Sequence, residues 1–150
     1  MTCDTYPWNA YARTHVEVHL PNGEIKTLAQ VDGEVGAWPF EEQEVWILTA
    51  CNPRSVQLTK TENLKRHETL GKQLEEMSLP HFYTLGFDPD DASENQWKED
   101  GYAVMGNHGD AVLNLAEQWE QNAVFVWRPQ LWTILGVLEK GECTSGWRYV

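Results

Sequence analysis

The chain has 150 residues, 41% of them hydrophobic, which is enough for one domain that buries roughly two-thirds of its unfolded surface. Its 23 acidic and 11 basic residues give a formal net charge of -12, which disfavours binding to the phosphate backbone of a nucleic acid. No run of about 18 apolar residues is present, which argues against a membrane-spanning helix.

The three cysteines, Cys3, Cys51 and Cys143, stand far apart and form no Cys-x-x-Cys pair. An odd number at these spacings argues against a disulfide framework or a zinc knuckle and favours a reducing compartment. The first residues lack the basic and apolar regions of a secretory signal, so we expect a cytoplasmic protein. Cys51 follows an apolar run and is expected to be a buried structural thiol.

The first predicted element is a hairpin over residues 14–28. Residues 16–20 alternate between apolar and polar side chains, and Pro21-Asn22-Gly23 is a typical turn before the second strand. An acidic, glycine-containing stretch at residues 32–44 follows, and we expect it to be a loop.

The central predicted element is an apolar strand at residues 45–50, whose β-branched and aromatic side chains indicate burial on both faces. A helix is expected from Thr59 to about Met77, since Thr59 and Glu62 have the spacing of a capping box. The remaining patterns predict strands at 82–87, 102–105, 123–127 and 131–138, and a second helix at 110–121.

From residue 45 onward the predicted order is strand, helix, strand, strand, helix, strand, which is the split βαβ arrangement of ferredoxin-like domains. We therefore expect a single α+β domain over residues 1–150. It would have a mixed sheet, two main helices, a ferredoxin-like core at about 45–138 and the N-terminal hairpin as an extension. A different mixed sheet with two helices on one face is the alternative.

The first predicted helix carries polar residues on its core-facing side. At about 100° per residue, Asn63 and Arg66 project to the same stripe as Leu70, Leu74 and Met77. An unpaired buried polar group is unfavourable, so both side chains need partners.

Two roles are open for these polar side chains. In the first, the amide anchors the loop 52–58 and the guanidinium pairs with an acid from the stretch 88–100. In the second, both belong to a ligand site at the carboxyl edge of the central strand, where a helix N-terminus favours an anion. Asn52 and Arg54 lie in the loop that leaves this strand and would be further ligands.

Two other segments carry candidate residues. Trp97 and Glu99 precede a predicted strand, and a carboxyl beside an indole has the raised pKa that suits a general base. Gln121 and Asn122 follow the second helix, where Asn122 is well suited to the left-handed residue that ends a helix.

No metal site or cofactor is expected. His15, Glu17 and His19 share one face of a strand, a set of ligands that can hold zinc or iron, but alternation on a polar outer face explains them better. No phosphate-loop, Rossmann or zinc-protease pattern is present.

Four short segments stand in a characteristic order along residues 45–127: Thr49–Pro53, Glu62–Arg66, Asp88–Pro89 with Trp97–Glu99, and Gln121–Ala123. Together they resemble a bacterial family known as domain of unknown function 3293. The chain departs from the pattern at Cys51 and by an acidic insertion around 90–94. The family has no assigned activity, so the resemblance implies only a set of positions: Asn52, Pro53, Asn63, Arg66, Trp97, Glu99, Gln121 and Asn122.

We expect a small domain that binds a small polar or anionic molecule, such as a nucleotide or a related metabolite. Arg66 would clamp the charge, the asparagines would orient it, Trp97 would form an apolar wall, and Glu99 would be the base of an enzyme. The alternative is an acidic interaction module, such as a phage-borne regulator or inhibitor, that docks a basic protein through residues 32–44 and 88–100.

Overall fold

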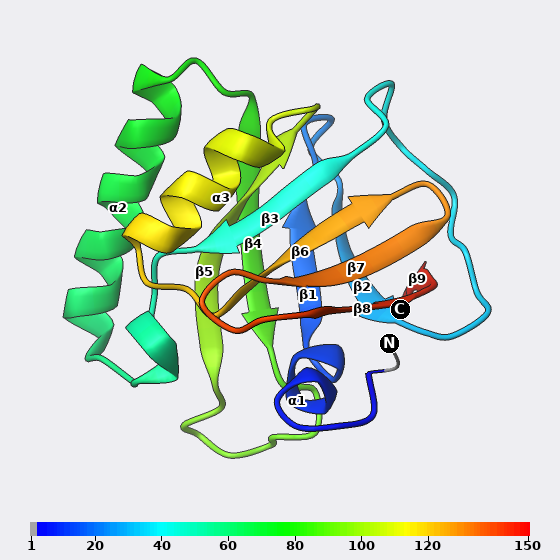
Figure 1. Ribbon diagram of the computed structural model, residues 1–150, viewed down its shortest axis with the longest axis horizontal. Helices are drawn as coiled ribbons and strands as arrows, with labels where there is room; N and C mark the ends of the chain where they lie inside the picture. Colours follow the sequence, from blue (N-terminus) through cyan, green and yellow to red (C-terminus); the bar gives the residue numbers. More distant parts are fainter. Residues whose placement is uncertain (1–2) are drawn as a thin grey trace.

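The computed structural model describes residues 3–150, which form three α-helices, one short 3-10 turn and one sheet of nine strands (Figure 1). The strands are β1 (His15–His19), β2 (Ile25–Gln30), β3 (Val45–Thr49), β4 (His81–Phe87), β5 (Lys98–Met105), β6 (Ala123–Arg128), β7 (Leu131–Gly136), β8 (Glu142–Ser145) and β9 (Trp147–Tyr149). The helices are α1 (Trp8–Ala12), α2 (Lys60–Glu76) and α3 (Gly109–Gln118), and the turn η1 is Pro53–Ser55.

The sheet curls until its two edges nearly meet. Its strand order is β8-β7-β6-β3-β5-β4-β1-β2-β9, and neighbouring strands pair antiparallel throughout residues 3–150. The two edge strands β8 and β9 are consecutive in the chain and are separated by Gly146 alone. The chain therefore passes directly from one edge of the sheet to the other, which gives the sheet the shape of a nearly closed barrel.

Gly146 is the residue at which the chain changes edges, and its surroundings leave no room for a side chain. A Cβ there would overlap the carbonyl oxygen of Glu34 and lie 2.7 Å from that of Val31. Hydrogen bonds hold the crossing in place: Val31 N–H donates to Gly146 O (3.1 Å), and Trp147 N–H donates to Glu34 O (2.9 Å). Only glycine lets the two backbones approach this closely.

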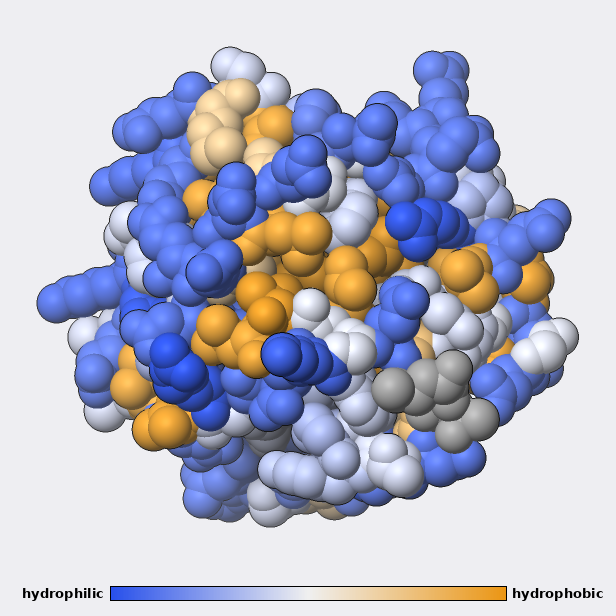
Figure 2. All heavy atoms as spheres, viewed as in Figure 1, coloured by the Kyte–Doolittle hydropathy of each residue, from blue (hydrophilic) through white to orange (hydrophobic). Residues whose placement is uncertain are grey.

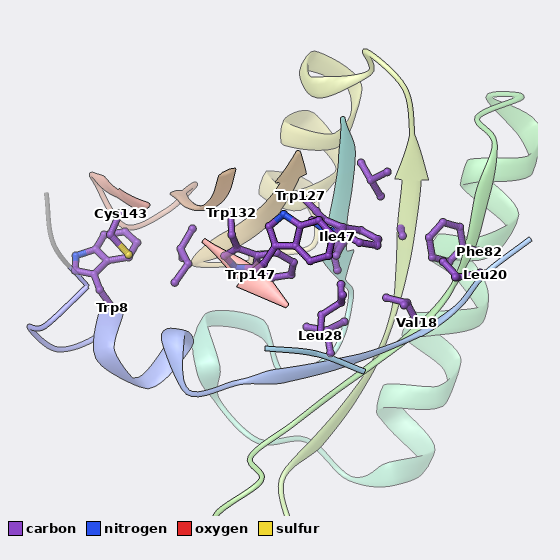
Figure 3. Packing of buried hydrophobic residues seen from close by; sticks show 14 residues of the cluster. Trp8, Val18, Leu20, Leu28, Ile47, Phe82, Trp127, Trp132, Cys143 and Trp147 are labelled. Carbon is purple, nitrogen blue, oxygen red and sulfur yellow. The ribbon is translucent and has the colours of Figure 1, made fainter. Parts of the chain in front are cut away.

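The inward side chains of the strands fill the barrel with a first hydrophobic core. Figure 3 shows Trp127, Trp132 and Trp147 meeting Ile47 and Leu28 in its centre. The Trp147 indole N–H donates to the Arg128 carbonyl (2.9 Å), so the ring is buried with its polar atom paired.

A second core lies between the outer face of the sheet and the helices α2 and α3, which pack side by side on it (Figure 1). Strand β3 contributes to both cores. Val45 and Ile47 face the barrel interior, and Trp46 and Leu48 face the helices. Burial on both faces of this strand, which its composition predicted, is confirmed.

Helix α2 begins with the predicted capping box. The Thr59 hydroxyl accepts from Glu62 N–H, and the Glu62 carboxylate accepts from Thr59 N–H. Its buried side differs from the expected stripe, because Met77 is 45% exposed. His67 and Gly71 are buried instead, and the His67 ring stacks on Tyr102 with centroids 4.4 Å apart.

The expected fold class is wrong. A mixed sheet with a ferredoxin-like two-helix core and an appended hairpin was predicted, whereas every strand pair is antiparallel and the sheet continues without a break through nine strands. The hairpin β1–β2 exists, but β1 pairs with β4 and β2 pairs with β9, so the hairpin is part of the barrel wall. The short elements α1, β8 and β9 were not predicted.

The prediction concerning the cysteines is also corrected. Cys3 and Cys143 form a disulfide, with Cα atoms 5.3 Å apart, that joins the N-terminal segment to β8. Cys51 is the free and buried thiol that was expected.

One face of the molecule is largely hydrophilic. Figure 2 shows hydrophilic side chains over most of one face and a band of apolar atoms across its middle. None of the helices formed by residues 3–150 has the length and apolar character needed to cross a membrane.

We predict that Gly146→Ala lowers the free energy of unfolding by roughly 3 kcal/mol or more, because the new methyl group overlaps a carbonyl oxygen that cannot move without breaking the crossing. Urea denaturation followed by tryptophan fluorescence measures the change. Gly86→Ala is the matched control, since a Cβ at this strand glycine has its nearest neighbour at 3.5 Å. Equal stability of the two variants would contradict the proposed role of Gly146.

Candidate functional site

One end of the barrel is open and contains a cavity of about 380 Å³. The end of β3, the end of β4, the start of β5 and the start of β6 surround it, and the segment around α1 covers part of its opening. The mouth of a β-barrel is a common place for a small-molecule site, because inward side chains there meet solvent on one side only. This barrel mouth is the candidate site.

Glu99, the second residue of β5, projects into the barrel mouth. Side chains alternate along a strand, and Glu99 falls on the same face as Ala103, which packs in the barrel interior. The strand starts at Lys98, earlier than predicted, and this earlier start is what gives Glu99 a fixed orientation. Trp97 directly precedes the strand and lines the same cavity.

Asn52 faces Glu99 from the loop after β3. Its backbone is left-handed (φ 50°), and its Oδ1 accepts from Leu58 N–H (2.9 Å) and from Asn63 Nδ2 (2.8 Å). Asn52 N–H in turn donates to Asn63 Oδ1 (3.0 Å). Because Oδ1 is already occupied, the Asn52 Nδ2 group is the one directed at the Glu99 carboxyl.

Glu99 is partly buried in the cavity wall, and within residues 3–150 it has no cationic partner. None of the ion pairs formed within residues 3–150 includes it. Burial raises the pKa of Glu99 to about 8, and the Asn52 amide offsets only part of this effect. A carboxyl that titrates near neutral pH can accept or donate a proton under physiological conditions.

Gln121 closes the cavity on the side of β6. Its Nε2 donates to the carbonyls of Cys51 (2.9 Å) and Trp119 (3.1 Å), and its side chain is 6% exposed. Asn122 lies beside it and donates from Nδ2 to Ser55 Oγ (3.0 Å).

The residue that ends α3 in the left-handed conformation is Glu120 (φ 56°), not Asn122 as predicted. Gln121 N–H then bonds back to Ala116 O (2.9 Å), which is the pattern of a Schellman motif. The shift by two residues places the side chains of Gln121 and Asn122 at the cavity.

Arg66 does not line the cavity. Its Nε donates to the Ala50 carbonyl, its NH2 group donates to the Trp119 carbonyl (2.9 Å), and its guanidinium lies 4.9 Å from the centroid of the Trp119 ring. It thus joins the end of β3 to the end of α3. None of the ion pairs formed within residues 3–150 joins it to an acid from the stretch 88–100.

The structure separates the candidate residues into two groups. Those that line the cavity are Asn52, Trp97, Glu99, Gln121 and Asn122. Those that lie outside its lining are Arg54, Asn63 and Arg66, of which Arg54 pairs with Glu120 at the surface (2.9 Å). Ligand binding by any of them stays a prediction.

Several cavity residues were not predicted from the sequence. Tyr11 and Arg13 come from the segment around α1, and Thr84 and Phe125 come from the inward faces of β4 and β6. The spacing of Trp8, Tyr11 and Ala12 is a weak helical signal that could have indicated α1. Inward-facing strand residues are found only once the curvature of the sheet is known.

The two acidic stretches are not uniform loops. In residues 32–44, Glu34 pairs with Arg148 (3.4 Å) and Glu44 with Arg128 (3.1 Å). In residues 88–100, Asp88 lines the cavity and the last three residues belong to β5. Docking of a basic protein stays a prediction.

Groups of three or more histidine, cysteine or acidic side chains placed to hold a metal ion do not occur within residues 3–150. His19 instead lies 2.8 Å from Glu17 on the outer face of β1. Burial raises the pKa of the Cys51 thiol to about 11, so this thiol stays protonated and is a poor nucleophile.

We predict that Arg66→Ala lowers the free energy of unfolding by roughly 2–3 kcal/mol, because two carbonyl oxygens lose a charged donor. Arg66→Lys should not restore stability, since a single ammonium group cannot span both oxygens as the planar guanidinium does. Denaturant titration measures both variants, and Lys65→Ala, at an exposed position on the same helix, is the control. Unchanged stability of Arg66→Ala would show that its role is not structural.

The raised pKa of Glu99 predicts a pH-dependent stability. Folded protein binds this proton more strongly than unfolded protein between about pH 4.5 and pH 8, so the free energy of unfolding should fall as pH rises through this window. Glu99→Gln removes the effect and should become more stable than wild type by a difference that grows up to pH 8, on the order of 4 kcal/mol at most.

Denaturant titrations of wild type and Glu99→Gln at pH 5 to 9 give this difference. Glu94→Gln is the control, because Glu94 is exposed in the loop before β5 and should differ from wild type by the same small amount at every pH. A constant difference between Glu99→Gln and wild type would contradict the predicted titration.

Comparison with known proteins gives one match. The family described as Protein of unknown function (DUF3293) matches residues 48–124, which is just over half of the chain and runs from the end of β3 through both main helices to the start of β6. No curated protein and no solved structure matches the chain. Since the matched segment contributes Asn52, Trp97, Glu99 and Gln121 to the barrel mouth, the candidate site lies mainly in the region that defines the family. The chain belongs to the DUF3293 family of proteins of unknown function.

Proposed function

We propose that this protein binds a small polar molecule in the barrel mouth. The observation that carries the proposal is the unpaired carboxyl of Glu99 inside a cavity of about 380 Å³, a size in the ordinary range of ligand pockets. A partly buried carboxyl without a cationic partner is unfavourable for folding, and such groups are concentrated at functional sites. A bound molecule would satisfy it.

The walls of the cavity support the same proposal. Trp97 and Phe125 offer apolar surface for the body of a ligand, and Asn52, Glu99 and Gln121 offer polar groups that fix its orientation. The hydrogen bonds between Asn52 and Asn63 hold the Asn52 side chain in place before a ligand arrives, so little conformational entropy is lost on binding.

A cytoplasmic location stays part of the proposal. The Cys3–Cys143 disulfide weakens its support, because such bonds are rare in reducing compartments. Cell fractionation together with the thiol content of the isolated protein would decide this point.

We predict that a thermal-shift screen of small polar metabolites finds compounds that raise the Tm of wild type, because a ligand at 100 times its Kd adds about 2.7 kcal/mol to the folded state. Ala10→Phe, which places a ring at the opening, should lose the shift. Ala92→Phe is the matched control, since Ala92 is exposed in the loop before β5 and should keep it. The proposal fails if no compound shifts wild type, or if Ala10→Phe responds like wild type.

A further inference from the structure

We propose that the barrel mouth selects a ligand with a planar, cationic N–H donor group, such as an amidinium or a protonated nitrogen heterocycle, which pairs with the Glu99 carboxylate while its flat body lies along Trp97. This inference rests on the proposed function and gives the chemical class of its ligand. It follows from the hydrogen-bonding atoms of the cavity, from its charges and from its aromatic walls.

Glu99 and Gln121 leave acceptor oxygens free on the inner wall of the cavity. The two Glu99 oxygens form no hydrogen bond to a cation within residues 3–150. Gln121 Nε2 donates to two backbone carbonyls, those of Cys51 and Trp119. Within residues 3–150, no donor forms a hydrogen bond with its Oε1. Asn52 is the opposite case, since its Oδ1 is occupied and its free Nδ2 already faces Glu99. A ligand that pairs with the Glu99 oxygens and with Gln121 Oε1 must bring N–H donors.

The charges of the cavity also favour a cation. The titratable or charged residues that line it are Tyr6, Tyr11, Arg13, Asp88 and Glu99. Arg13 is exposed at the rim, whereas Glu99, which becomes negative when it loses its proton, lies inside the mouth, and Asp88 adds a carboxylate. The guanidinium of Arg66, which would have attracted an anion, is bound to two carbonyls outside the cavity.

Aromatic side chains give this site its shape. Trp97 and Phe125 line the cavity, with Tyr11 on the side of α1. Faces of aromatic rings attract cations and stack on flat groups. These walls therefore stabilise a bound planar cation, but they do not stabilise a flexible aliphatic anion in this way. A carboxylate beside an aromatic wall is thus matched to a delocalised, planar cation.

Binding of such a cation is coupled to the loss of a proton. In the empty site Glu99 holds a proton at neutral pH, because its pKa is raised to about 8. When the cation binds, the carboxyl O–H bond breaks, the proton passes to solvent, and the carboxylate pairs with the ligand N–H groups. Affinity should therefore rise about tenfold per pH unit below pH 8 and level off above it.

The test uses three compounds of nearly identical shape: benzamidinium, benzamide and benzoate. Their Kd values for wild type and for Glu99→Gln are measured by isothermal titration calorimetry at pH 6, 7.5 and 9, in two buffers that differ in ionisation enthalpy. We expect benzamidinium to bind wild type more tightly than benzamide, benzoate to bind most weakly, and proton release to accompany benzamidinium at pH 6 and 7.5. Glu99→Gln should weaken benzamidinium at least tenfold at pH 9 and leave benzamide nearly unchanged.

Benzamide binding to Glu99→Gln shows that the cavity of the variant is intact, and Glu94→Gln is the control for the loss of one acid elsewhere. The inference is overturned if benzoate binds as tightly as benzamidinium, or if Glu99→Gln keeps the affinity for benzamidinium. It is also overturned if none of the three binds. If some compounds in the metabolite screen still raise the Tm, the proposed function stands and only the inferred ligand class is wrong. If no compound raises the Tm, the proposed function and the inferred ligand class both fail.

Discussion

The crossing at Gly146 is the constraint on which the rest of the structure depends. It lets residues 142–149 supply both edges of one sheet, with β8 beside β7 and β9 beside β2. Because the edges are brought together in this way, the inward faces of the strands enclose a core of their own, with Trp127 and Trp147 at its centre. The disulfide between Cys3 and Cys143 reinforces the same region by fixing the N-terminal segment to β8.

A curled sheet also creates the candidate site. The strands that surround the barrel mouth come from distant parts of the sequence, and side chains on their inward faces converge only because the sheet is curved. Glu99 is the clearest example. On a flat sheet with an open inner face it would be fully solvated, whereas inside the mouth it is partly buried and its pKa is raised.

The polar residues of segment 48–124 fall into two groups: some hold other groups in position, and others face the cavity. Arg66 and Asn63 hold backbone and side chains in position, the first by binding the carbonyls of Ala50 and Trp119, the second by orienting Asn52. Asn52 and Glu99 then face the cavity. The guanidinium of Arg66 therefore lies close to the candidate site, but its N–H groups are bound to backbone carbonyls and do not line the cavity.

The local elements could be predicted from the sequence. The capping box at Thr59, the doubly buried strand β3 and the hairpin β1–β2 each depend on residues close together in the chain. Five of the residues that the sequence singled out line the cavity: Asn52, Trp97, Glu99, Gln121 and Asn122. The sequence could not distinguish those that line a cavity from those that support it, because Asn63, Arg66 and Glu99 are all polar residues at positions expected to be partly buried. That distinction, like the antiparallel barrel in place of the expected mixed sheet, was decided by tertiary structure, since it depends on which distant strands become neighbours and on how far the sheet curls.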